Sequence, residues 1–236
     1  MPVGPGPVSA AVGDDAVSGG ASPPVAGGPV VAIDGPAAAG KGTLARRLAA
    51  ELGLLYLDTG LLYRAVGRRV LDAGADPADP AVAEAAARAL APADLARTDL
   101  RGPAADAAAS RVATHPGVRA ALVAFQRGFA RGRGAVLDGR DIGTVIFPDA
   151  RAKLFVTAAL ETRARRRWLE MQARGVDVPL DRVEAEMRAR DAQDAGRAEA
   201  PLRPADDAVV LDTTALDPDA AFREALARVR ARLAEA

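Results

Sequence analysis

The sequence predicts an α/β fold in which helices cover both faces of a doubly wound parallel sheet. Two observations carry this prediction. Short apolar segments alternate along the chain with longer segments whose apolar residues recur at helical spacing, a pattern typical of parallel β-α-β units. The first apolar segment, 29–33, has no polar residue at any position, as expected for a strand that is buried on both faces.

The elements can be placed in order along the chain. Strands are expected at 29–33, 54–57, 135–137, 153–156 and 208–211. Helices are expected at 41–52, 60–73, 105–131, 162–174, 180–194 and 218–233. Gly53 and Gly74 end the first two helices, because glycine readily adopts the left-handed conformation of a helix C-terminus. Thr59 is a candidate N-cap for the second helix, and His115-Pro116-Gly117 is expected to break the third.

Residues 29–236 are predicted to form one domain, preceded by a disordered tail at 1–28. The tail is rich in Gly, Pro, Ala, Ser and Val, and it lacks the basic start and continuous apolar stretch of a signal peptide. A start codon assigned too far upstream would explain the same composition. Residues 75–104, with Asp-Pro turns and an Ala-rich helix, are expected to form an insertion on the main sheet.

Composition narrows the function classes. The 236 residues suit one α/β domain, and 50% of them are hydrophobic, which is ample for a core. Basic and acidic residues balance at 31 each, which argues against a general binder of nucleic acid or of membrane surfaces. The absence of cysteine excludes a disulfide framework, thiol catalysis and a cysteine metal site. No apolar run has transmembrane length, and a cytoplasmic location is expected.

A glycine-bounded loop between the first strand and the first helix is the strongest motif. Its pattern predicts a P-loop, in which backbone N–H groups and the helix N-terminus surround a phosphate chain while Lys41 reaches the outer phosphates. A glycine-rich turn without a ligand is the alternative. The candidate ATP-binding residues are Gly35, Pro36, Ala37, Ala38, Ala39, Gly40, Lys41, Gly42 and Thr43.

The loop departs from the usual pattern at one position. Gly42 follows the lysine where Ser or Thr is common, and Thr43 comes next. This Gly-Lys-Gly-Thr variant resembles the loop of nucleoside monophosphate kinases more than that of GTPases or motor ATPases. A small residue at position 42 also leaves room for a second substrate beside the phosphates.

Three further constellations follow strands or lie on a charged helix. Asp58–Arg64 places Tyr63 and Arg64 one helical turn from Thr59, and an arginine there can bind a phosphate through two N–H groups. Gly139-Arg140-Asp141 is expected to form a fixed loop with an anion-binding arginine. Arg190, Asp194 and Arg197 share one helix face and suit a mobile lid over a phosphoryl group. Solvated surface charges are the alternative for each set.

Three other features receive structural interpretations. His115 precedes a proline and is expected to be structural, and Asp34 is expected to stabilise the loop that follows it. The arginine-rich segment 163–167, followed by Trp168, is interpreted as a solvated helix face with one packing aromatic rather than as an RNA-binding surface.

These four constellations, in this order and spacing, resemble the bacterial cytidylate kinase family from about Val30 to the C-terminus. The matching motifs are Ile-Asp-Gly-Pro with Gly-Lys-Gly-Thr-Leu, Leu-Asp-Thr-Gly-Leu-Leu-Tyr-Arg, Asp-Gly-Arg-Asp-Ile-Gly-Thr-Val-Ile-Phe-Pro-Asp-Ala, and Arg-Asp…Asp…Arg…Ala-Pro-Leu. The resemblance implies a P-loop kinase fold with a helical lid at about 175–198. It also implies transfer of the γ-phosphate of ATP to CMP or dCMP with Mg²⁺.

The resemblance also implies roles for individual residues. The expected catalytic residues are Lys41, Arg140, Arg190 and Arg197. The expected CMP-binding residues are Thr59, Tyr63, Arg64, Arg101, Ser110, Arg119, Arg140, Asp141, Arg190 and Asp194, of which Ser110, Arg119 and Asp141 would face cytosine. No protein side chain is expected to ligate a metal directly; Mg²⁺ would be held by ATP phosphates and water near Thr43. A monomer without nucleic-acid or membrane partners is expected.

The sequence departs from the family pattern in two places. Gln193 and Ala195 stand where well-studied members carry further lid arginines, which lowers the expected lid charge. The insertion is short, and 93–103 is too polar for the small antiparallel sheet that members commonly carry there. Two alternative functions stay open at this point: another small P-loop kinase with a different acceptor, and a non-catalytic nucleotide-gated module that binds RNA through 163–167.

Overall fold

A computed structural model describes residues 27–235. Apart from Gly27 and Gly28, the tail predicted at 1–28 lies outside the described residues, so its disorder stays a prediction.

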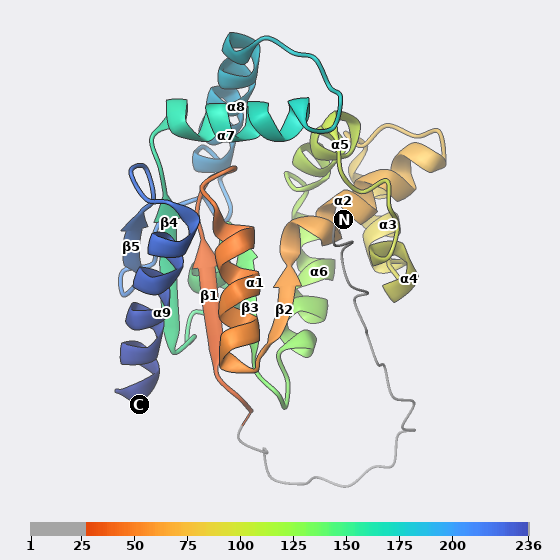
Figure 1. The fold of residues 1–236 in the computed structure, drawn as a ribbon. Helices are drawn as coiled ribbons and strands as arrows, with labels where there is room; N and C mark the ends of the chain where they lie inside the picture. Colours follow the sequence, from red (N-terminus) through yellow and green to blue (C-terminus); the bar gives the residue numbers. More distant parts are fainter. Residues whose placement is uncertain (1–26, 236) are drawn as a thin grey trace, which may run out of the picture.

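A parallel sheet lies at the centre of the fold and confirms the predicted class (Figure 1). The five strands have the spatial order β2-β3-β1-β4-β5, and every neighbouring pair is parallel. Their bounds are β1 (Val30–Asp34), β2 (Leu55–Asp58), β3 (Ala135–Gly139), β4 (Ala152–Thr157) and β5 (Val209–Asp212).

All five strands extend beyond their predicted ends, and the added residues of β1, β2 and β3 include Asp34, Asp58 and Asp138. Asp34 pairs in register with Gly139, and Asp58 pairs with Asp138. Hydrophobic pattern alone places a strand's end at its last apolar residue, whereas the backbone ladder continues through these aspartates. Their carboxylates therefore lie together at the C-terminal edge of the sheet, where open α/β sheets bind ligands.

The helices lie close to their predicted positions. They are α1 (Lys41–Leu52), α2 (Thr59–Asp72), α3 (Pro80–Arg88), α4 (Pro92–Leu95), α5 (Pro103–Val112), α6 (Pro116–Phe129), α7 (Leu160–Gln172), α8 (Leu180–Ala195) and α9 (Pro218–Ala234). A π-helical turn, η1 (Ile142–Ile146), follows β3. The break at His115 is confirmed, because Pro116 begins a new helix at a position that needs no backbone donor.

The predicted cap at Thr59 is wrong. Asp58 occupies the N-cap position of α2, and Thr59 is the first residue inside the helix. The Thr59 hydroxyl instead donates a 2.7 Å hydrogen bond to the carbonyl oxygen of Asp138. This bond joins the start of α2 to the end of β3.

The helices cover both faces of the sheet. Helices α1 and α9 pack on one face, where Val31, Ile33 and Val136 point. Helices α2, α3 and α6 pack on the other face, where Ala32 and Leu137 point. Figure 1 shows α1 and α9 in front of the strands and α6 behind them. This arrangement fixes the sheet as a rigid base and leaves its C-terminal edge free for a site.

Residues 75–104 contain two helices, α3 and α4, and no strand. Ala83 and Ala87 of α3 are buried in the same apolar cluster as Leu137 of the sheet. The antiparallel sheet that the family commonly carries is therefore absent from this segment, in agreement with its short, polar sequence.

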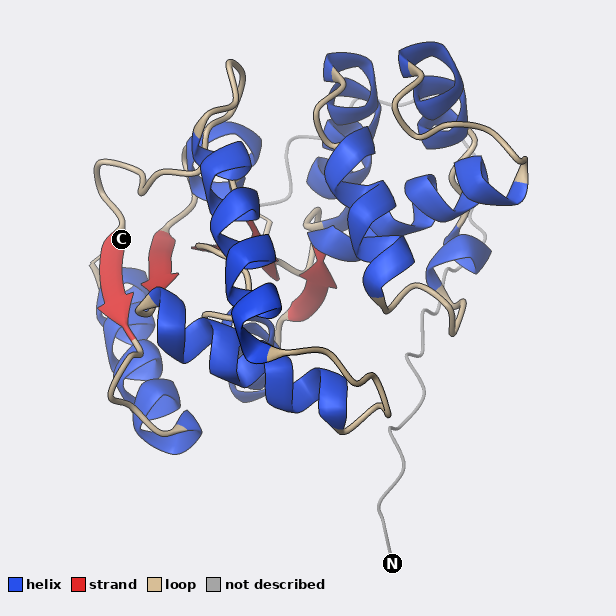
Figure 2. Cartoon of the chain, turned by 90° about the horizontal axis from the view of Figure 1, so that it is seen from above, coloured by secondary structure: helices blue, strands red, loops and turns tan. Residues whose placement is uncertain are grey.

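Helices α7 and α8 form a cap above the C-terminal edge of the sheet (Figures 1 and 2). They pack on each other through a small apolar cluster that includes Met171, Val183 and Met187. Trp168 also packs there, and its indole N–H donates a 2.9 Å hydrogen bond to Val178. The packing interpretation of this tryptophan is confirmed, and the cap has its own core, separate from that of the sheet.

Across residues 27–235, no helix has both the length and the apolar character that crossing a membrane requires.

Candidate active site

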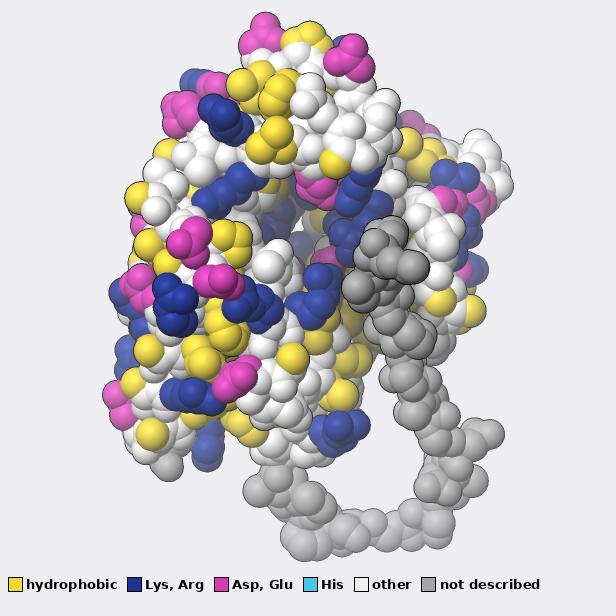
Figure 3. Space-filling view, in the orientation of Figure 1, with side chains coloured by type: hydrophobic (Ala, Val, Ile, Leu, Met, Phe, Trp, Pro, Cys, Tyr) yellow, Lys and Arg dark blue, Asp and Glu magenta, His cyan; other side chains and the backbone are white. Residues whose placement is uncertain are grey.

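A large cavity lies beyond the C-terminal ends of the strands, between the sheet and the α7–α8 cap. Its volume is about 1100 Å³, which is at the upper end of the range for small-molecule sites and leaves room for two ligands. Figure 3 shows lysine and arginine side chains around the hollow below the cap. Ten lysine and arginine side chains and eight aspartate and glutamate side chains line the cavity, so many of its positive charges are paired with carboxylates.

The loop after β1 has the geometry that phosphate binding needs. Gly35 has φ +145°, and a Cβ there would lie 2.0 Å from the carbonyl oxygen of Val156, so only glycine fits. Gly40 has φ +89° and is the N-cap of α1, and Ala38 is left-handed with φ +57°. Ala37–Thr43 line the cavity, whereas Gly35 and Pro36 shape the base of the loop.

Lys41 lies under this loop. Its ammonium donates a 2.9 Å hydrogen bond to the carbonyl oxygen of Pro36, and its side chain is buried. Burial, together with the nearby charge of Arg140, lowers the pKa of Lys41 to about 7. A phosphate anion placed in the loop would favour the charged form and raise that pKa again.

Asp138 is a buried carboxylate at the end of β3 that sequence reasoning missed. It accepts a 2.8 Å hydrogen bond from the Tyr56 hydroxyl, and burial raises its pKa. A Cβ on Gly42 would lie 3.5 Å from the Asp138 carboxylate. The small residue after Lys41 therefore leaves space between the phosphate loop and this acid.

Arg64 and its neighbours form the wall opposite the loop. Arg64 makes a 2.9 Å ion pair with Asp58, and Arg101 lies 3.9 Å from the same carboxylate. Tyr63 and Thr59 also line the cavity. Burial raises the pKa of Tyr63 to about 12, so its hydroxyl stays a neutral donor. Each of these side chains comes from β2, α2 or the segment that leads into α5.

Asp141 and Arg119 form a buried ion pair deeper in the same wall. Arg119 comes from α6, and Asp141 directly follows Arg140 at the end of β3. Burial raises the pKa of Asp141 despite the opposing charge of Arg119. Ser110 of α5 lines the cavity too, so the three residues predicted to face cytosine surround one volume.

Arg140 connects the sheet to the cap. Its Nε donates a 2.8 Å hydrogen bond to Asp194 of α8, and Asp194 also pairs with Arg197. Burial acts to raise the pKa of Asp194, but the charges of Arg140 and Arg197 outweigh it and hold the pKa below its usual value. Arg190 lines the cavity from one helical turn earlier, and burial lowers its pKa to about 10.

Three of these arginines have an unused hydrogen-bond donor. Within residues 27–235, the Nε atoms of Arg64, Arg190 and Arg197 are buried and have no hydrogen-bond partner. Unpaired buried donors on cations are costly. All three residues line the cavity, so an anion bound there could give these donors partners if their guanidinium groups turned toward it.

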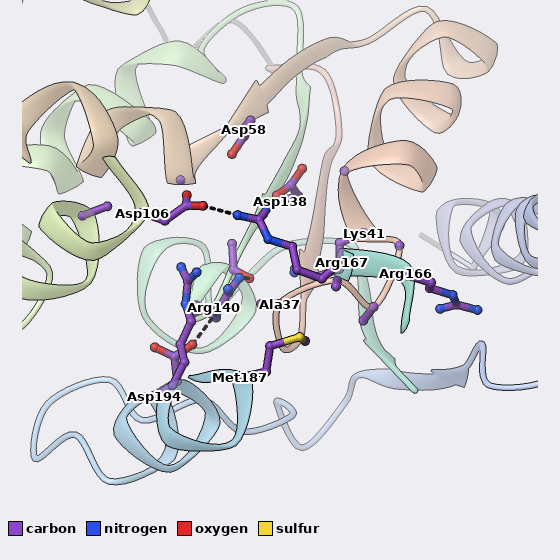
Figure 4. A pocket seen from close by; sticks show the side chains of 18 of the residues that line it. Ala37, Lys41, Asp58, Asp106, Asp138, Arg140, Arg166, Arg167, Met187 and Asp194 are labelled. Atoms are coloured by element: carbon purple, nitrogen blue, oxygen red, sulfur yellow. Dashed lines mark hydrogen bonds and ion pairs between the residues drawn. The ribbon is translucent and has the colours of Figure 1, made fainter. Parts of the chain in front are cut away.

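Sequence reasoning also missed the contribution of α7. Arg163 is buried, with its guanidinium in a two-bond ion pair with Asp191 of α8 and hydrogen-bonded to the carbonyl oxygen of Ala158. Arg166 donates to Thr213, and Arg167 reaches across the cavity to Asp106 of α5 (Figure 4). The interpretation of 163–167 as a solvated face is therefore wrong for these three arginines.

Helix spacing could have given the missing signal. Arg163, Arg166, Arg167 and Glu170 recur at intervals of three and four and so share one face of α7. Arg166, Arg167 and Glu170 of this face line the cavity, and Figure 4 shows Arg167 directed across it toward Asp106. A run of arginines does not by itself show which side chains face the protein. The apolar residues between them show which face of the helix is buried.

The structure brings the predicted acceptor and lid residues into one cavity. All of them line it: Lys41, Thr59, Tyr63, Arg64, Arg101, Ser110, Arg119, Arg140, Asp141, Arg190, Asp194 and Arg197. Gln193, one of the departures from the family pattern, lies within 3.5 Å of the carbonyl oxygen of Ser110. The cap thus touches α5 through an uncharged side chain. His115 contacts the Pro77 carbonyl oxygen at 3.0 Å, in line with the structural role expected for it.

The oxygen groups near the loop suit a cation held mainly by a ligand. In the part of the chain that the structure describes, no three His, Cys, Asp or Glu side chains are grouped as a metal site. Thr43 and the Asp138 carboxylate line the cavity beside Lys41. They offer hard oxygen donors of the kind that Mg²⁺ accepts next to phosphate oxygens and water.

Comparisons with known proteins agree on one family. The family model described as cytidylate kinase matches residues 31–231. A cytidylate kinase of Granulibacter bethesdensis is 63% identical over 201 residues, covering 85% of this chain and 96% of the relative. Cytidylate kinases of Paramagnetospirillum magneticum and Cereibacter sphaeroides are 64% and 59% identical, covering 84% and 87% of this chain and 95% and 97% of the relatives.

Proposed function

The chain belongs to the cytidylate kinase family, and on that premise we propose that it transfers the γ-phosphate of ATP to CMP or dCMP. The products are ADP and CDP or dCDP. The observation that supports this most directly is the set of unpaired guanidinium donors of Arg64, Arg190 and Arg197 around the same cavity as the Lys41 loop. Such donors suit the charge of a transferring phosphoryl group.

The donor half of the site is the loop from Gly35 to Thr43. Its backbone N–H groups and the N-terminus of α1 would hold the phosphates of ATP. Lys41 would leave the Pro36 carbonyl oxygen and contact the outer phosphates. Arg167 of the cap, which now pairs with Asp106, would be drawn to the same phosphates.

The acceptor half lies on α2, α5 and α6. Arg64 and Arg140 would bind the acceptor phosphate, assisted by the hydroxyls of Thr59 and Tyr63, with Arg101 at the edge. Arg190, Asp194 and Arg197 would close over the phosphates and the acceptor sugar. No general base is required, because the acceptor phosphate is already an anion.

Cytosine would be recognised by the buried Arg119–Asp141 pair with Ser110. A carboxylate accepts from the exocyclic amino group of cytosine, and a guanidinium donates to its ring acceptors. Uracil presents a carbonyl oxygen in place of the amino group. It would place two acceptors face to face at Asp141, and the buried site could not relieve that repulsion with water.

Magnesium fits the donor half. Thr43 and Asp138 are the residues beside the phosphate loop that would help to hold Mg²⁺, most of its coordination coming from phosphate oxygens and water. When bound, the ion would neutralise the charge that develops on the bridging phosphate oxygens.

The proposal is tested with a panel of acceptors. The purified chain is given ATP and Mg²⁺ with CMP, dCMP, UMP, AMP or shikimate in turn, and ADP formation is followed. CMP or dCMP should support turnover at least about tenfold more efficiently than the others, given the unpaired polar groups that a wrong base leaves. ADP that forms equally without CMP, or only with another acceptor, would overturn the assignment.

A further inference from the structure

Asp34, the last residue of β1, holds the backbone just after the predicted cytosine-binding residue Asp141. Its Oδ1 accepts a hydrogen bond from the N–H of Ile142 and its Oδ2 accepts one from the N–H of Gly143, each at 2.8 Å. The Asp34 side chain is only 5% exposed. Neither of these hydrogen bonds goes to the phosphate loop that Asp34 is expected to stabilise; both go to η1.

These two N–H groups begin a helical turn, where backbone donors have no partner inside the turn. A side chain at the N-cap position can accept from such donors, as Asp79 does at the start of α3 and Asp217 at the start of α9. In η1 the cap is supplied by another strand, and the local N-cap residue, Asp141, makes no side-chain cap bond. The Asp141 carboxylate is thereby left free to pair with Arg119.

The peptide group between Asp141 and Ile142 is held at both of its polar atoms. Its carbonyl oxygen accepts from Val145 at 2.9 Å and from Ile146 at 3.2 Å, which closes the η1 turn. Its N–H, that of Ile142, is the one that Asp34 holds. Asp34 is followed directly by Gly35, the first residue of the phosphate loop. The residue that holds the start of η1 is therefore bonded to the loop that would bind ATP.

We propose that Asp34 is a positioning residue for acceptor recognition: it orients the Asp141 carboxylate toward the acceptor base by holding the start of η1. This inference rests on the proposed function. Both carboxylate oxygens are needed, since each accepts one N–H. An asparagine keeps one acceptor and turns an amino group against the other N–H, which leaves two buried donors facing each other.

The experiment compares Asp34→Asn with a matched control, Asp79→Asn. Asp79 caps α3, and its Oδ1 alone accepts from both Ala81 and Val82, so an asparagine keeps both bonds. KM for CMP, KM for ATP, and the ratio of kcat/KM for CMP to that for UMP are measured for each.

Asp34→Asn should raise KM for CMP by about tenfold and lower the CMP-to-UMP ratio of kcat/KM by about tenfold. Leaving one buried N–H without an acceptor weakens binding by about this factor. KM for ATP should change by less than about threefold. The Asp79→Asn constants should equal those of the unmodified chain. A proportional loss for both acceptors, or equal rises in KM for CMP and ATP, would show that Asp34 only supports the fold and would overturn the proposal.

A second variant keeps the test decisive if Asp34→Asn does not fold. Asp34→Glu keeps the charge and both acceptor oxygens but moves them by one methylene group, so they can no longer meet the N–H groups of Ile142 and Gly143 in the present geometry. It should shift acceptor selectivity in the same direction, and unchanged selectivity would contradict the proposal. Absence of CMP phosphorylation by the unmodified chain would instead overturn the proposed function, and the positioning role with it.

Discussion

Lys41 is the residue whose environment most directly links structure to catalysis. In the free chain its ammonium is buried against a backbone carbonyl, and burial with the nearby Arg140 charge lowers its pKa to about 7. The charged form binds phosphate, so the lysine is poised near neutral pH to respond to ATP. Lys41→Ala should reduce turnover by roughly 10²–10³-fold, as removal of one transition-state donor typically does.

The lowered pKa of Lys41 predicts a pH dependence. kcat/KM for ATP reports groups of the free enzyme, so it should fall as pH rises through about 7 and Lys41 loses its proton. The residual activity of Lys41→Arg should lack this alkaline fall, because a guanidinium stays charged. An unmodified chain whose kcat/KM for ATP is flat from pH 6.5 to about 9 would contradict this account of Lys41.

Asp141 is the residue that should separate cytosine from uracil. Asp141→Asn presents an amino group that can donate to the uracil carbonyl oxygen. It should lower kcat/KM for CMP and bring the CMP-to-UMP ratio down by roughly 10–100-fold. Parallel measurements with CMP and UMP check this, with KM for ATP as the internal control. A variant that loses activity on both acceptors equally would place Asp141 outside base recognition.

At the scale of elements, the close packing of α2 on α5 positions the acceptor wall. A Cβ on Gly67 of α2 would lie 2.8 Å from the Ala108 methyl group and 3.0 Å from the Ala108 backbone. Gly67→Ala should therefore push α5 and Ser110 away from α2. We expect a loss of about 1–3 kcal/mol in unfolding free energy, typical of overpacking, and a higher KM for CMP.

Gly128→Ala is the matched control for that change. Gly128 lies in α6, and an added Cβ meets no atom within 4 Å among the described residues. Removing a helix glycine there should stabilise the chain by about 0.5–1 kcal/mol. Denaturant unfolding of both variants provides the comparison. Equal effects of the two alanines would contradict close α2–α5 packing as the cause.

Helix ends could be predicted from the sequence where nearby residues determine them. The start and end of α1 follow from Lys41 and Gly53, and the break before α6 follows from Pro116. The η1 turn did not follow, because Ile142–Ile146 reads as apolar sequence without a helical period. Its conformation depends on Asp34, which is 108 residues away along the chain.

In the candidate site, too, residues in short motifs were predictable, and residues positioned by distant parts of the chain were not. Lys41, Arg140 and Asp141 were predictable because they stand in short motifs beside predicted strand ends. Arg163 was not, since its ion-pair partner Asp191 comes from α8, 28 residues further along the chain. Asp138 was missed because hydrophobic pattern ends β3 before it, although the ladder continues through it.

At the scale of the whole molecule, the net charge is zero although the cavity under the cap is lined by many charged side chains. Opposite charges balance over the chain, yet Arg140, Arg190 and Arg197 converge on one cavity with Lys41. The cap has its own core, which includes Met171 and Met187, and ion pairs join it to the rest of the site: Arg140–Asp194 at the end of β3 and Arg167–Asp106 on α5. Such contacts can rearrange when phosphates compete for the same guanidinium groups, so we expect the cap to close over bound nucleotides.

The most direct test of the account follows the phosphoryl group itself. The purified chain is incubated with ATP labelled in the γ-phosphate, Mg²⁺ and CMP, and the products are separated. The account predicts that the label appears in CDP, at a rate that falls sharply in Lys41→Ala. Label that appears only as free phosphate, or that enters UDP from UMP as fast as it enters CDP, would contradict cytidylate phosphorylation at this site.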